Sequence, residues 1–162
     1  KQMFNFFKKK EIKHSVYAVA NGTTVALKDV PDPTFAEEMI GKGVAIIPTD
    51  GKVVAPVSGT VSMVFPTNHA VGLVDENGVE VLVHIGIDTV SMKGEGFTGH
   101  VKQGDTVKAG DLMIEVDLDK VKEAGFNTII PVIITNTPSF TAVEGLAGKD
   151  VKVGDEVISI TK

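Results

Sequence analysis

The sequence predicts an all-β fold, an antiparallel β-sandwich or barrel with one or two short helices. Three observations favour this fold class. Short runs rich in β-branched residues recur along the whole chain. The 17 glycines and 7 prolines supply turns between these runs. Segments with helical start and stop signals are few and short.

Each expected strand segment is a β-branched run that ends at Gly, Pro, Asn or Asp. In chain order, these segments are residues 23–30, 43–49, 51–65, 79–87, 99–117, 129–135 and 150–160. Their regular spacing is typical of a sandwich or barrel.

Two segments predict short helices. Residues 31–43 offer Asp32 or Thr34 as an N-cap and Gly41 as a stop. Residues 117–125 begin at an aspartate and end on a glycine. Neither segment is long enough to change the fold class.

A weak internal repeat accompanies the strands. The stretches "VKQGDTVKAGDLMIEVD" and "VKVGDEVISI" share a V-K-x-G-D-x-V core, and "PVSGTVSMV" is a looser relative. Each predicts two short strands joined by a Gly-Asp turn. Two related β-units that pack together would explain the repeat, and so would the frequent use of Gly-Asp turns in β proteins.

Composition narrows the class of protein. A length of 162 residues fits one domain, expected over residues 16–162 behind a flexible tail at 1–15. The net charge of −5 argues against nucleic acid as a partner. Without cysteine, the chain has no disulfide and no Cys nucleophile, which suits a reducing cytoplasm. We expect the tail to be solvated. Its three phenylalanines, followed by a run of three lysines, could alternatively form a weak membrane-surface anchor.

Two histidines lie on what the sequence predicts to be one apolar hairpin. His69 and His84 flank the turn signal Asp75–Gly78. A two-residue loop places the rings opposite each other or one diagonal apart, and in both registers they share a face. A bulge would break this parity. The histidine face would carry His69, Val71, Leu73, Glu80, Leu82 and His84, and the core face Ala70, Gly72, Val74, Val79, Val81 and Val83.

Paired histidines on an apolar face favour a functional role over a structural one. Two imidazoles make only part of a zinc site, and no metal is expected. A hydrolase would need a nucleophile that no motif here supplies. Transfer of a phosphoryl group to one neutral imidazole, with a hydrogen bond from the other, fits these residue types best. An apolar rim would keep water from a labile phosphohistidine.

Several motifs resemble a known family. They are "VPDPTFAEEMIGKGVAIIPT", "GKVVAPVSGTV", "FPTNHAVGL", "VEVLVHIGIDTVSMKGEGF", "VKQGDTVKAGD" and "IIPVIITN", in this order between Val16 and Ile160. Together they resemble the IIA domain of the glucose family of the bacterial phosphoenolpyruvate-dependent sugar phosphotransferase system. The resemblance implies a β-sandwich with barrel-sandwich-hybrid character.

The resemblance also implies roles for individual residues. His84 would accept a phosphoryl group from the phosphohistidine of the carrier HPr and pass it to a cysteine of a IIB domain of a sugar permease, without a cofactor. His69 would assist the transfer, and the Thr67 hydroxyl would bond to the histidine pair. The protein would be cytoplasmic. Ile85 replaces the Phe of many members, and Pro66 replaces the Glu of some relatives.

A docking surface for both partners is implied as well. Carried onto this chain, it comprises Asp32, Met39, Ile40, Phe65, Val71, Leu82 and Asp88. For Met39 and Ile40 the alternative is inward packing of a short helix, and Asp88 could be a turn carboxylate. This surface could also bind regulated transporters or enzymes.

One alternative comes from a different class of protein. The Gly-Asp repeats and the dipeptide Met92-Lys93 suggest a biotinyl or lipoyl carrier module with a modified lysine. The flanking residues lack the second Met of such modules, and the chain is about twice their usual length. A non-catalytic regulatory binding domain is compatible with the phosphocarrier interpretation.

Overall fold

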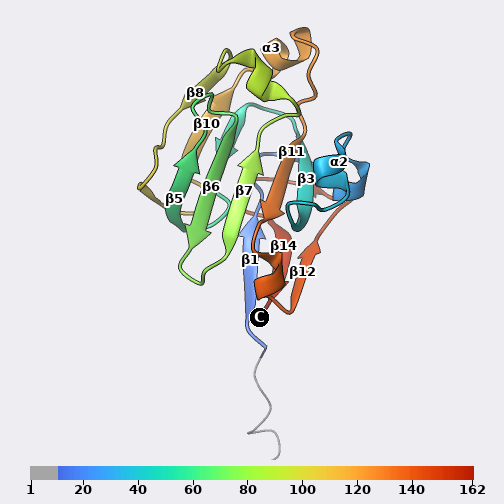
Figure 1. The fold of residues 1–162 in the computed structure, drawn as a ribbon, viewed down its shortest axis with the longest axis vertical. Helices are drawn as coiled ribbons and strands as arrows, with labels where there is room; N and C mark the ends of the chain where they lie inside the picture. The colour runs from blue at the N-terminus through green and yellow to red at the C-terminus, as the bar shows by residue number, and fades with distance from the viewer. Residues whose placement is uncertain (1–10) are drawn as a thin grey trace, which may run out of the picture.

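A computed structural model describes residues 11–162 (Figure 1). The strands are β1 (Lys13–Tyr17), β2 (Gly22–Val25), β3 (Lys42–Pro48), β4 (Lys52–Val54), β5 (Gly59–Val64), β6 (Ala70–Asp75), β7 (Glu80–His84), β8 (Phe97–Gly99), β9 (Thr106–Val107), β10 (Leu112–Val116), β11 (Ile130–Ile134), β12 (Ala142–Gly145), β13 (Asp150–Val151) and β14 (Glu156–Thr161). The α-helices are α2 (Pro33–Ala36) and α3 (Leu118–Glu123), and the 3-10 helices are η1 (Leu27–Asp29), η2 (Thr89–Met92) and η3 (Thr137–Ser139).

The strands form three antiparallel sheets. The largest has the order β13-β2-β3-β11-β7-β6-β5-β9, and the smaller ones have the orders β1-β14-β12 and β4-β10-β8. Every paired register is antiparallel. The all-β fold class with short helices is therefore confirmed.

Two apolar clusters lie on opposite faces of the largest sheet. The main core contains Val44 and Ile46 of β3, whereas Ala45 between them belongs to a second cluster. This alternation follows from the period of two along a strand. In the second cluster, Phe35 of α2 and Ile133 of β11 pack together, so α2 and η1 cover part of the outer face (Figure 1). No helix of residues 11–162 covers the rest of that face, over β6 and β7.

The helix signals are confirmed in position but not in length. Asp32 caps α2, because its carboxylate accepts the Thr34 N–H at 2.9 Å. α2 ends at Ala36, well before the expected stop at Gly41. Glu38 has a positive φ, which cannot continue a right-handed helix. The second helix, α3, is capped by the Asp117 carboxylate as its sequence suggests.

The predicted register of the histidine hairpin is wrong by one residue. Ala70 pairs with His84, and Val71 pairs with Val83. The cause is a three-residue loop, in which Gly78 has a φ of +82°. Such a loop adds a bulge that a two-residue turn lacks. Consequently β6 presents the opposite face to the one expected, with Ala70, Gly72 and Val74 outward and Val71 and Leu73 in the core.

The Gly-Asp repeat corresponds to one turn geometry used three times. Asp105, Asp111 and Asp155 each accept a hydrogen bond, at 2.8–2.9 Å, from the backbone N–H of the lysine three residues earlier. Each is preceded by a glycine with a φ between +94° and +99°. The sequence repeat is therefore a repeat of local structure.

The expected tail is too long at its inner end. Lys13, His14 and Ser15 pair with β14, so they belong to the sandwich. Residues 1–10, with most of the suggested membrane-surface segment, lie outside the described residues. Within residues 11–162, no helix is long and apolar enough to span a membrane.

We expect Gly78 to stabilise the hairpin register through its backbone conformation alone. No atom lies within 4 Å of a Cβ built at this glycine, so space does not limit a substitution. Gly78→Ala should lower the free energy of unfolding by about 1 kcal/mol in urea denaturation, because alanine disfavours positive φ. Gly78→Asn should lower it less, since asparagine tolerates this conformation. Equal stability of all three proteins would contradict this account.

Candidate active site

His84 lies at the end of β7 with one ring nitrogen already engaged. Its Nδ1 lies 2.7 Å from the carbonyl oxygen of Gly86. A carbonyl only accepts hydrogen bonds, so a neutral His84 carries its proton on Nδ1. Nε2 then has a free lone pair. This is the protonation state that a nucleophilic imidazole needs.

His69 lies in the loop between β5 and β6 rather than in a strand. The Asn68 N–H donates to the Phe65 carbonyl, and the Phe65 N–H donates to the Ala70 carbonyl. Asn68 has a φ of 59°, a conformation that asparagine adopts more readily than most residues. This turn, and not strand parity, directs the His69 side chain.

Thr67 contacts His69 as the family resemblance implies. Its hydroxyl lies 2.5 Å from Nδ1 of His69. A hydroxyl can donate to this nitrogen or accept from it. With the hydroxyl as donor, the proton of a neutral His69 lies on Nε2.

Four aromatic rings form a series through the site. The His69 and His84 rings are 5.1 Å apart at an angle of 82°. Phe65 packs on His69, and Phe35 packs on His84, each at 5.0 Å. These edge-to-face and tilted contacts are favourable for aromatic pairs. The phenylalanines therefore enclose the histidine pair from both sides.

Burial keeps both imidazoles neutral at pH 7. The His69 residue is only 3% exposed. Burial, followed by the proximity of His84, lowers the pKa of His69 to about 4. Burial also lowers the pKa of His84.

Three neighbouring groups oppose that effect at His84. The hydrogen bond to the Gly86 carbonyl raises its pKa, as do the charges of Asp32 and Asp88. These contributions offset only part of the burial effect. They would favour a positive charge on the ring if one formed there.

Most residues of the implied docking surface lie around His84. Met39 is 72% exposed, whereas Ile40, Phe65 and Leu82 are half-buried. Asp32 is half-buried and Asp88 is exposed. Inward packing, the alternative for Met39 and Ile40, does not describe Met39, whereas Ile40 packs against the second cluster.

Val71 does not belong to this surface. It is fully buried in the main core, opposite Val83. The bulge in the hairpin turned β6 over, so the expected outward position is wrong. A partner cannot contact a side chain with no exposed area.

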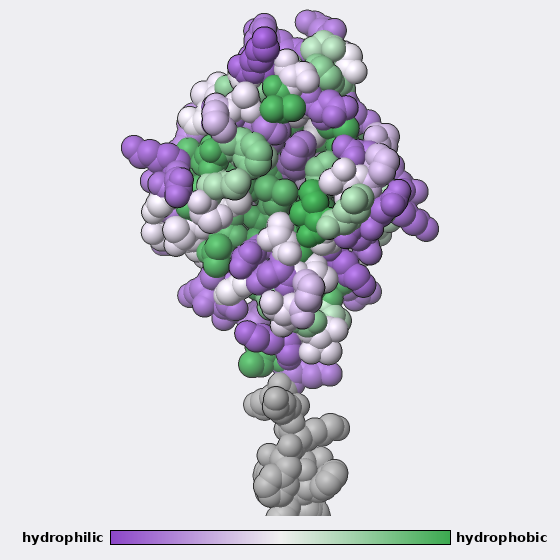
Figure 2. All heavy atoms as spheres, viewed as in Figure 1, coloured by the Kyte–Doolittle hydropathy of each residue, from purple (hydrophilic) through white to green (hydrophobic). Residues whose placement is uncertain are grey.

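Sequence reasoning missed several residues of the site. Phe35 and Gly86 lie within the quoted motifs, but nothing in their spacing revealed the contacts with His84. Val90, 53% exposed, is the second residue of η2, whose N-cap is Asp88. Met63 of β5 is exposed and pairs with Gly72 on the outer face. Figure 2 shows apolar side chains gathered at the centre of this face, with polar ones around them.

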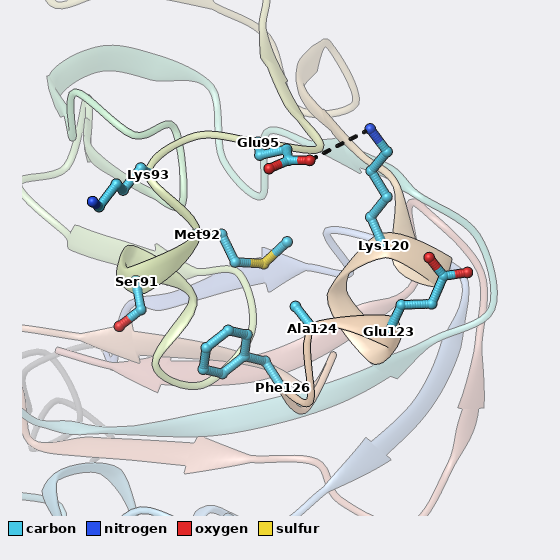
Figure 3. Close-up of a pocket in the computed structure, with 8 residues that line it drawn as sticks. All are labelled: Ser91, Met92, Lys93, Glu95, Lys120, Glu123, Ala124 and Phe126. Carbon is cyan, nitrogen blue, oxygen red and sulfur yellow. Dashed lines mark ion pairs between the residues drawn. The ribbon is translucent and has the colours of Figure 1, made fainter.

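One cavity is formed without either histidine. It has a volume of about 560 Å³ and is formed by η2, α3 and the segments that follow them (Figure 3). Met92 points into it, and an ion pair of 3.9 Å joins Lys120 to Glu95 at its edge. Lys93 also borders this cavity, where it ends η2; it does not lie at a hairpin turn, as a lysine of a biotinyl module would.

No metal-binding cluster occurs in the described part of the chain. Residues 11–162 contain no group of three or more His, Cys, Asp or Glu side chains that could hold a metal ion. The histidine pair therefore has no third protein ligand within these residues.

Known proteins are similar to this chain in sequence and in fold. A family described as "phosphoenolpyruvate-dependent sugar phosphotransferase system, EIIA 1" matches residues 14–140. Among solved structures, a glucose permease IIA from Mycoplasma capricolum has a TM-score of 0.85 at 41% identity. That match covers 94% of this chain and 97% of the other.

Curated relatives extend the comparison over nearly the full chain. A glucose-specific EIIA component of Halalkalibacterium halodurans is 52% identical over 140 residues, which cover 86% of this chain and 81% of the relative. One from Oceanobacillus iheyensis is 41% identical, with 98% and 96% covered. A glucose-specific EIICBA component of Streptococcus pneumoniae is 51% identical over 83% of this chain, but only 19% of that longer protein is matched.

The low pKa of His69 predicts a pH dependence of stability. An unfolded chain binds a proton on this histidine below about pH 6.5, whereas the folded protein does not until about pH 4. The unfolded state therefore binds more protons in this window, and stability falls as the pH decreases through it. We expect His69→Gln to weaken this dependence by up to about 1.4 kcal/mol per pH unit in urea denaturation. An identical pH dependence in both proteins would show that His69 is not held neutral.

Proposed function

This chain belongs to the EIIA 1 family of the phosphoenolpyruvate-dependent sugar phosphotransferase system, and we propose that it carries a phosphoryl group on His84. The group comes from the phosphohistidine of HPr and passes to a cysteine of a IIB domain during sugar uptake. The observation that carries the proposal is the Nδ1–H of His84 bonded to the Gly86 carbonyl, beside a second neutral histidine.

The lone pair on Nε2 of His84 attacks phosphorus. The N–P bond to the donor histidine breaks as the Nε2–P bond forms, and the donor imidazole keeps the electron pair of the broken bond. The Nδ1 proton stays on His84, bonded to Gly86. The phosphorylated ring then carries a positive charge. The Gly86 carbonyl and the Asp32 and Asp88 carboxylates stabilise that charge. In the next step, the thiolate of the IIB domain attacks the same phosphorus and His84 leaves.

His69 assists without becoming the carrier. In this role Thr67 would donate to its Nδ1, which leaves the proton of His69 on Nε2, where it can donate to a phosphoryl oxygen. The ring lies beside His84, where the incoming group would lie. Because His69 is neutral at pH 7 and carries its proton on Nε2 in this arrangement, that nitrogen donates a hydrogen bond and has no lone pair with which to attack phosphorus.

The apolar surface around the rings serves partner binding. A docked partner covers Met39, Leu82 and Phe65, and excludes water from the phosphoramidate bond. HPr and the IIB domain bind here in turn, because the same nitrogen must face both. The Streptococcus pneumoniae relative is named an EIICBA component, which agrees with a IIB domain as the acceptor.

The other candidates have less support. The position of Lys93 at the end of η2 does not favour a biotinyl or lipoyl module. A regulatory role through the same surface remains compatible with phosphoryl transfer. The sugar is expected to be glucose, by analogy with the named relatives.

Phosphorylation by the upstream proteins tests the proposal directly. We expect incubation with phosphoenolpyruvate, enzyme I and HPr to add one acid-labile phosphoryl group, detected by intact mass. His84→Ala should take up none. His69→Ala should still be phosphorylated but should pass the group to a IIB domain about 100-fold more slowly or worse. His100→Ala is the matched control, because its ring pairs with Glu115 outside the site. Uptake by His84→Ala, or none by the wild type, would reject the proposal.

Truncation of Met39 tests the docking surface. Met39→Ala should raise the KM for phosphorylated HPr roughly tenfold with a smaller change in kcat, because a contact residue is removed and the chemistry is not. Val153→Ala is the control, since this exposed apolar side chain lies in the turn before β14. Equal KM values for both variants would remove Met39 from the surface.

A further inference from the structure

Thr89 is a buried polar residue to which the proposed chemistry gives no direct role. It begins η2 and has no exposed area. Its hydroxyl donates to the Ile85 carbonyl at 2.5 Å. A buried hydroxyl needs such a partner, but several acceptors could serve. The acceptor here is the carbonyl of Ile85, the residue directly after His84.

Ile85 is the residue that connects the two histidines through the backbone. It follows His84 directly, and its N–H donates to the His69 carbonyl at 2.7 Å. Its carbonyl accepts the Thr89 hydroxyl. The backbone of Ile85 is thus held at both its N–H and its C=O. Both histidines depend on this residue for their relative position.

The position of Gly86 also depends on Thr89. A Cβ at Gly86 would lie 2.4 Å from the Thr89 methyl carbon, so this methyl group fills the space beside the glycine. Gly86 has a φ of +82°, and its N–H donates to the Ile129 carbonyl. The same residue presents its carbonyl to Nδ1 of His84 at 2.7 Å. Thr89 therefore contacts the peptide segment that determines the tautomer of His84.

We propose that Thr89 is a positioning residue for phosphoryl transfer, whose hydroxyl and methyl hold Ile85 and Gly86 so that the Gly86 carbonyl faces Nδ1 of His84. This inference rests on the proposed function, because the tautomer matters only if Nε2 is the nucleophile. Without the Gly86 acceptor, a neutral imidazole exchanges between its two tautomers. The Nε2–H form has no lone pair at the attacking nitrogen.

Thr89→Val tests this role because it keeps the shape of the side chain and removes the hydroxyl. In the unphosphorylated variant, we expect nitrogen chemical shifts to show His84 as a mixture of tautomers, against the single Nδ1–H form of the wild type. The kcat for accepting a phosphoryl group should fall about tenfold or more, with the KM for phosphorylated HPr unchanged. A purely structural role would change neither readout in the folded protein.

Thr24→Val is the matched control. Thr24 is also buried, and its hydroxyl also donates to a backbone carbonyl, that of Lys149. It lies in β2, which β3 and β11 separate from β7 in the sheet. Thr24→Val should lower the free energy of unfolding by about as much as Thr89→Val does. It should leave the His84 tautomer and the kcat unchanged.

A smaller pair of variants covers the case in which Thr89→Val does not fold. Thr89→Ser keeps the hydroxyl and Thr89→Ala removes it, and neither adds volume. The serine variant should retain the Nδ1–H form better than the alanine variant. A folded Thr89→Val or Thr89→Ala with the wild-type tautomer and kcat overturns the positioning role. A wild-type protein that takes up no phosphoryl group overturns the proposed function instead, and the tautomer measurements distinguish the two failures.

Discussion

The hydrogen bond from Nδ1 of His84 to the Gly86 carbonyl is the contact on which the site depends. It exists because the chain turns sharply directly after β7, with a positive φ at Gly86. That turn is anchored on the segment just before β11, since the Gly86 N–H donates to the Ile129 carbonyl and the Ile87 N–H to that of Asn127. This pairing fixes the protonation of one ring nitrogen and leaves the other available.

The apolar outer face desolvates the two imidazoles, and this has two effects. Covering the rings with Phe35 and Phe65 removes water from the imidazoles, so the neutral forms are favoured. The same lack of water would preserve a phosphohistidine and would favour a partner that covers the face. Helix α2 and η1 shield only the part over β3 and β11. Within residues 11–162, no helix covers the part over β6 and β7, so this part can bind another protein.

Backbone strain is concentrated around the histidines. In residues 11–162, the non-glycine residues with positive φ are Glu38, Asn68, Asp88 and Lys93. One follows α2, one precedes His69, and two flank η2. Such conformations cost about 1–3 kcal/mol each and persist where the surroundings require them. Their gathering in the loops around one site supports a functional constraint on these loops, separate from the stability of the sandwich.

Local sequence determined the strands and the helix caps, and it indicated that His69 and His84 act together. β-branched runs, Asp caps and Gly-Asp turns act over a few residues, so their patterns can be read without the fold. The register of the hairpin could not be read, because a bulge at Gly78 reversed the face of β6 and placed Val71 in the core. The two imidazoles still meet, since a turn at Asn68 directs His69 independently of strand parity. Contacts between segments far apart in the chain, such as Phe35 on His84, arise only when the sheet brings those segments together. Tertiary structure therefore decided the enclosure, the protonation and the accessible nitrogen of the histidine pair.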